Sequence, residues 1–91
     1  MTSLPTQDDP PAFGCLVYIA NKPTGGVTAR VANLEGFQIE ASDERSALGK
    51  LVPLFRNRVA QMMADNQDVP WIDPPHPIED NEFKRFLPVH L

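Results

Sequence analysis

The stretch SDERSALGKLVPLFRNRVAQMM, residues 42–63, decides the fold because it carries a helical apolar period. We predict that Ser42 caps this helix, with Asp43 and Glu44 at the positive end of the helix dipole. Pro53 removes one backbone hydrogen bond, so we expect a kink near Gly49 in a helix that ends near residues 65–66. One face of the helix is apolar, with side chains at spacings of three and four: Leu48, Leu51, Val52, Phe55, Val59, Met62 and Met63.

Three stretches before the helix have the pattern of β-strands. Residues 15–21, CLVYIAN, are apolar, aromatic and β-branched, which is typical of a strand with both faces largely covered. Residues 27–34 and 37–42 alternate apolar and polar side chains, which is typical of strands with one solvated face. Turns with glycine, at 22–26 and 33–36, separate the three stretches, so the sequence predicts an antiparallel meander.

The residues after the helix predict a long ordered loop and a fourth strand. Residues 67–81 hold four prolines and little periodicity, whereas residues 82–91 alternate again and contain Pro88, which favours an edge strand. The predicted fold is therefore α+β, with the order β-β-β-α-β. The kinked helix covers one face of the sheet, and the other face stays open. The last strand lies beside the first and parallel to it, which gives the spatial order 3-2-1-4. Residues 14–91 form this single domain, and residues 1–13 are expected to be a disordered leader.

Composition narrows the classes of partner. The 91 residues include 12 acidic and 8 basic side chains, a net charge of −4, which disfavours nucleic acid and favours a basic protein surface. The single cysteine, Cys15, suits a reducing compartment. No apolar run is long enough for a bilayer, and the first residues do not resemble a secretory signal. We expect a cytoplasmic protein that binds no membrane and needs no cofactor.

Several short segments resemble the HicB-like antitoxin family. The family has the segment Pro-Asp-Leu-Pro-Gly-Cys at its third strand, then Gly-Asp-Thr, then Glu-Ala-Leu at the start of its helix. The matching segments here are VANLEGF at 31–37, EAS at 40–42 and RSAL at 45–48. A proline-flanked segment after the family's helix is similar to VPWIDPP at 69–75, so the resemblance spans about residues 15–75.

This resemblance implies a truncated ribonuclease-H-like fold that binds and neutralises a small basic toxin. The chain departs from the family's pattern with Asn33 for Asp, Glu35 for Pro, Phe37 for Cys, and Ala41-Ser42 for Asp-Thr. The positions that match, such as Leu34 and Gly36, are mostly structural. Because nothing follows Leu91 in this sequence, we expect no DNA-binding segment of the kind that the family usually carries.

Two other classes of function remain open alternatives. A small metal-dependent hydrolase or nuclease would use Glu40, Asp43 or the acidic loop, because such chemistry needs convergent carboxylates. The first strand has no carboxylate, and Asp73, His76, Glu79 and Asp80 have no recognised ligand spacing, so we expect no metal site and no catalysis. The second alternative is an orphan structural domain that associates only with itself.

The predicted partner-binding residues lie on the outward sheet face and in the acidic loop. Trp71 either covers the open end of the core or anchors an interface. Residues 65–82 hold six acidic and no basic side chains, so they are either an acidic dock or a solvated loop. The C-terminal edge strand offers a route to a homo-oligomer. The partner-binding candidates are Tyr18, Arg30, Gln38, Glu40, Trp71 and Asp73.

Overall fold

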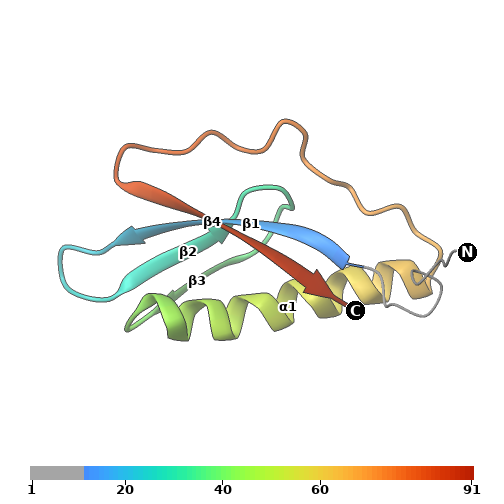
Figure 1. Ribbon diagram of the computed structural model, residues 1–91, viewed down its shortest axis with the longest axis horizontal. Helices are drawn as coiled ribbons and strands as arrows, with labels where there is room; N and C mark the ends of the chain where they lie inside the picture. The colour runs from blue at the N-terminus through green and yellow to red at the C-terminus, as the bar shows by residue number, and fades with distance from the viewer. Residues whose placement is uncertain (1–11) are drawn as a thin grey trace, which may run out of the picture.

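The computed structural model describes residues 12–91, which form a four-stranded antiparallel sheet with one helix packed on it (Figure 1). The elements are β1 (Ala12–Asn21), β2 (Val27–Val31), β3 (Gln38–Ala41), α1 (Glu44–Ala64) and β4 (Glu82–His90). The sheet order β3-β2-β1-β4 confirms the predicted α+β fold and strand order. The predicted leader lies outside the described residues, except that its last two residues, 12 and 13, begin β1.

The hydrophobic core lies between α1 and the inward face of the sheet. The predicted stripe of α1 is confirmed, because its buried positions follow spacings of three and four. Met63 is an exception: it lies one residue beyond the buried Met62, so it is turned away from the sheet and is 43% exposed. The fully buried centre of the core contains Cys15, Val17, Ile19, Leu51, Phe55 and Val59.

The helix continues through Pro53 without a break. A proline inside a helix leaves the carbonyl four residues earlier, here that of Gly49, without its helical donor. Both Gly49 and Pro53 lie on the exposed side of α1, where water can take the place of the missing donor. The proline is therefore tolerated within one uninterrupted helix.

Asp43, and not Ser42 as predicted, caps the N-terminus of α1. Asp43 has an extended backbone, and its Oδ1 accepts a hydrogen bond of 2.7 Å from the amide of Ser46. This bond stabilises the carboxylate and so lowers the pKa of Asp43 below its ordinary 3.8. The prediction from the sequence was wrong by one residue because both residue types are good caps.

We expect Asp43→Ala to lower the free energy of unfolding, whereas Ser42→Ala leaves it almost unchanged. The reason is that only Asp43 accepts a bond from the first turn. Because folding lowers the pKa of Asp43, its contribution is complete well above pH 3.8 and is lost as the pH falls through the lowered value. Urea titrations of both variants at neutral and acidic pH measure this, and an equal effect of the two substitutions would contradict it.

The direction of β4 differs from the prediction. The strand pairs with β1 in an antiparallel register that runs from Ala12 opposite His90 to Ala20 opposite Glu82. Figure 1 shows why: after α1 the loop runs back along the whole sheet before β4 begins. This second crossing starts β4 at the opposite end of the sheet from the one assumed, so the expected parallel pairing was wrong.

The second face of the sheet is also not open. Tyr18, Ala20 and Ala32 are buried, although the Tyr18 side chain points away from the helix-covered core. The loop of residues 67–81, here called the strap, lies on this outer face of the sheet opposite α1 (Figure 1). The sheet is therefore covered by a helix on one face and partly by the strap on the other.

Candidate functional site

Hydrogen bonds fix the strap to the sheet. The amides of Ile72 and His76 each donate over 3.0 Å, to the carbonyls of Asn33 and Ala32 at the end of β2. The Tyr18 hydroxyl on β1 donates to the carbonyl of His76 over 2.7 Å. The strap is thus a fixed part of the surface, in agreement with the prediction of an ordered loop.

The side chain of Asn33 is the support on which these contacts depend. Its Oδ1 accepts from the amide of Leu16 over 3.1 Å, and its Nδ2 donates to the carbonyl of Gly14 over 2.9 Å. One side chain therefore takes the place of a strand backbone, which continues the contact with β1 after β2 has ended at Val31. The predicted strand of residues 27–34 is shorter for this reason. The pattern around Asn33 gives no sequence signal for this role.

Arg30 joins the sheet to the end of the strap. Its Nε and Nη2 each donate to one carboxylate oxygen of Glu82 over 2.8 Å, and Nη2 also donates to the carbonyl of Pro77 over 3.1 Å. The guanidinium lies 5.1 Å from the centre of the Tyr18 ring, within the range of a cation–π contact. The hydrogen bond from Arg30 is the main reason that the pKa of Glu82 lies below its ordinary value.

We expect Glu82→Gln to reduce stability at neutral pH and to flatten its dependence on pH. The Glu82 side chain is only 10% exposed, and the change would leave the Arg30 charge without its carboxylate. Since folding lowers the pKa of Glu82, its contribution is complete well above the ordinary 4.5 and disappears as the pH falls through the lowered value. Urea midpoints of wild type and Glu82→Gln should therefore converge in acid. Glu40→Gln, at an exposed pair, is the control and should behave as wild type.

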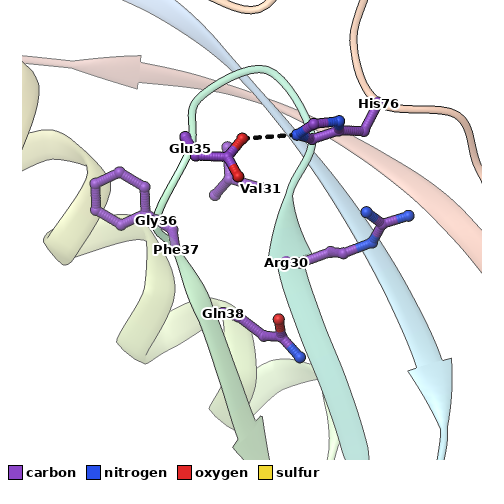
Figure 2. A pocket seen from close by; sticks show the side chains of 7 residues that line it. All are labelled: Arg30, Val31, Glu35, Gly36, Phe37, Gln38 and His76. Atoms are coloured by element: carbon purple, nitrogen blue, oxygen red, sulfur yellow. Dashed lines mark hydrogen bonds and ion pairs between the residues drawn. The ribbon is translucent and has the colours of Figure 1, made fainter.

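A small polar pocket of about 210 Å³ opens between the strap and the β2–β3 turn. In Figure 2, Arg30 and Gln38 lie along the neighbouring strands β2 and β3, while His76 reaches from the strap toward Glu35. His76 Nε2 and Glu35 Oε1 are 2.7 Å apart at this rim. Such a pocket offers hydrogen-bond donors and acceptors to one polar group. Its lining consists of Arg30, Val31, Glu35, Gly36, Phe37, Gln38 and His76.

Three of the predicted partner-binding residues are brought together here. Tyr18 and Arg30 are opposite each other on β1 and β2, and Gln38 is opposite Arg30 on β3. Glu40 lies farther along the outer face and forms an exposed ion pair of 2.8 Å with Lys22. Tyr18 is buried under the strap, so it supports this surface and offers little area to a partner.

Trp71 and Asp73 belong to different parts of the strap. The Trp71 ring stacks on Phe13 at 5.8 Å and lies 5.9 Å from Phe55, so it covers the end of the core between β1 and α1. It is nevertheless 37% exposed. Asp73 follows it and is exposed to solvent. Of the two interpretations of Trp71, covering the core accounts for its contacts.

Exposed acidic side chains gather on the strap, and exposed basic side chains gather on α1. The exposed strap acids Asp68, Asp73, Glu79 and Asp80 form no ion pair with any residue of the range 12–91. On the opposite face, α1 carries exposed basic side chains: Arg45, Lys50, Arg56 and Arg58. The acidic strap and the basic side chains of α1 therefore lie on opposite faces of the sheet.

Two of the carboxylates proposed for catalysis have structural roles. Asp43 caps α1, and Glu40 is paired with Lys22. Between residues 12 and 91 no group of three or more His, Cys, Asp or Glu side chains is placed to hold a metal ion. In the same part of the chain, no helix is both long and apolar enough to cross a membrane. Comparison with protein-family models, curated proteins and solved structures finds no match for this chain.

Proposed function

We propose that this chain is a non-catalytic protein–protein interaction module that binds a small basic protein on its strap face. The observation that carries the proposal is the strap itself: a long acidic segment held against the sheet by hydrogen bonds, with four exposed carboxylates that lack an ion pair in the described chain. Opposite charge on a partner would both attract it and fix its orientation.

The rigidity of the strap supports binding over simple solvation. A flexible acidic loop would lose conformational entropy on association, whereas a strap held by Ala32, Asn33 and Tyr18 is already ordered. The polar pocket beside it adds a place for one polar side chain of the partner. The pocket itself holds one carboxylate, Glu35, beside Arg30 and His76, so the exposed carboxylates of the strap are what suits a partner with clustered Lys or Arg.

The resemblance to HicB-like antitoxins points to the same kind of partner. We infer a domain similar to the toxin-binding part of that family, acting in the cytoplasm on a small basic toxin-like protein. The residues behind the resemblance have roles that this fold requires: Leu34 and Ala47 are buried, and Gly36 has a φ of 98°, which favours glycine. They support a similar fold, while the acidic strap supports the choice of partner.

The experiment is capture of the partner with the tagged full chain, followed by titration calorimetry with the captured protein. We expect a small basic protein whose affinity falls as salt is added, because the Debye length shrinks from about 10 Å at 0.1 M to about 3 Å at 1 M. Recovery of no basic protein above background from the source cell would contradict the proposal.

A pair of charge variants locates the binding face. Asp73→Asn combined with Glu79→Gln removes two charges from the strap, and we expect it to weaken binding. Glu44→Gln combined with Asp65→Asn removes two charges at the two ends of α1, outside the strap, and serves as the matched control, with affinity close to wild type. Equal weakening by both double variants would mean that only net charge matters and would reject the strap as the site.

A further inference from the structure

The outer edge of β4 has no neighbouring strand in the described chain, because β4 is the last strand in the order β3-β2-β1-β4. Both backbone groups of Leu16 are turned toward β2, since its amide bonds to Asn33 and its carbonyl to Ala32. In a strand, alternate residues turn their backbone groups to opposite sides, so those of Cys15 and Val17 face β4. Their partners are Leu87 and Arg85. The residues between and beyond these partners therefore turn their backbone groups to the free edge: Glu82, Lys84, Phe86, Pro88 and His90.

Two features modify the hydrogen-bonding pattern of this edge. Pro88 has no amide hydrogen, so one donor is missing. The carbonyl of Lys84 already accepts a bond of 3.1 Å from Nη1 of Arg85, so one acceptor is occupied. The groups that remain for another strand are the amide of Lys84, both groups of Phe86, the carbonyl of Pro88, both groups of His90, and the carbonyl of Glu82, whose amide already donates to Glu79.

An apolar side chain stands beside the same edge. Phe86 is 66% exposed, more than any other large apolar side chain among residues 12–91. The tip of its ring lies against Gly14 on β1, where a Cβ atom would come within 2.6 Å of two ring atoms. Gly14 therefore leaves room for the ring to lean from β4 toward β1, beside Leu16, the residue opposite Phe86. The ring thus leans away from the free edge and leaves the backbone of Phe86 open to an additional strand.

We propose that a second copy of this chain pairs with β4 in an antiparallel register, with the two-fold axis at Phe86. The two sheets then form one continuous sheet, with the backbones of the two Phe86 residues opposite each other at its centre. In this register Lys84 of each copy lies opposite Pro88 of the other. The proposal does not depend on the partner proposed for the strap.

The missing donor and the occupied acceptor select this register. When Lys84 faces Pro88 of the other copy, the carbonyl of Lys84 receives no bond from the proline. This carbonyl already accepts a bond from Arg85 of its own chain. A shift of two residues in either direction places the proline opposite the carbonyl of Phe86 or Glu82, which would be left unpaired. The two-fold axis places the missing amide of Pro88 opposite the occupied carbonyl of Lys84 in both copies. This match is the reason for choosing a second copy as the occupant.

Sedimentation equilibrium of the full chain tests the dimer. We expect twice the monomer mass, and we expect Phe86→Pro to raise the dissociation constant about tenfold or more, because it removes the amide that Phe86 donates across the two-fold axis. Phe86→Ser is the matched control: it removes the same ring, which is 66% exposed, but keeps the amide, and it should remain a dimer. Phe86 is at the surface, so circular dichroism should show both variants folded. A monomer at all concentrations up to about 100 µM, an affinity in the range of non-specific contacts, would overturn the proposal.

Disulfide trapping tests the register. Opposite residues in a hydrogen-bonded antiparallel pair have Cα atoms about 5.5 Å apart, which a disulfide can span. A mixture of Lys84→Cys and Pro88→Cys chains should therefore cross-link, while neither variant should cross-link alone. The native Cys15 does not compete, because burial raises its pKa to about 12. Cross-links in either single variant, or a dimer that forms no mixed disulfide, would overturn the register.

Discussion

Phe55→Ala is expected to lower the free energy of unfolding by about 3–5 kcal/mol, the usual cost of truncating a buried phenylalanine. Phe55 is fully buried. The centre of its ring lies 6.3 Å from that of Phe37 and 5.9 Å from that of Trp71. Its loss would leave a cavity where helix, sheet and strap meet. Equilibrium unfolding in urea, followed by circular dichroism, measures the change.

The neighbouring residue provides the control for this prediction. Leu54→Ala truncates a side chain on the same helical turn that is 51% exposed, so we expect a change within about 0.5 kcal/mol. Because Trp71 is the sole tryptophan, its fluorescence should also shift in Phe55→Ala. A loss similar to that of Leu54→Ala would mean that the core does not center on Phe55.

Asn33→Ala is expected to lower the free energy of unfolding by about 2–3 kcal/mol, because two backbone groups lose their partners. The amide of Leu16 and the carbonyl of Gly14 are part-buried and both depend on the Asn33 amide group. Hydrogen exchange at the Leu16 amide should accelerate more than exchange in the helix. Urea unfolding gives the global value.

Gln38→Ala is the matched control for Asn33→Ala. Gln38 is also an amide, but it is exposed and its side chain forms no hydrogen bond with residues 12–91. We therefore expect a change within about 0.5 kcal/mol. If the two substitutions cost the same, the Asn33 side chain does not act as a substitute for strand backbone.

The sequence was sufficient for the elements and for their order. Alternation in residues 27–31 and the stripe from Leu51 to Met62 are local patterns, and the structure follows both. Pro88 correctly indicated an edge, because its missing donor lies on the side of β4 that has no neighbouring strand among residues 12–91. The direction of β4 could not be read in this way, since it depends on how far the strap travels before the strand begins.

The contacts of the site could not be predicted, because they join residues that are distant in sequence. Arg30 and Glu82 are 52 positions apart, and neither neighbourhood contains a signal for the pair. His76 was considered only as a weak metal ligand, whereas it contacts Glu35 and, through its backbone, Tyr18 and Ala32. Both examples depend on the path of the strap, whose sequence has no apolar periodicity from which that path could be predicted. Trp71 was partly predictable, because a large ring next to an open core end has few other places to go.

The pairing of β1 with β4 has a consequence for the folding pathway. β1 meets β2 through a short hairpin, but Ala20 meets Glu82 only after the helix and strap have formed a large loop. Contacts between such distant positions slow folding, because loop-closure entropy must be lost before they form. The hairpin and helix should therefore assemble first, leaving a transient species in which one side of β1 is unprotected. Dilute protein and low temperature should favour refolding over aggregation of that species.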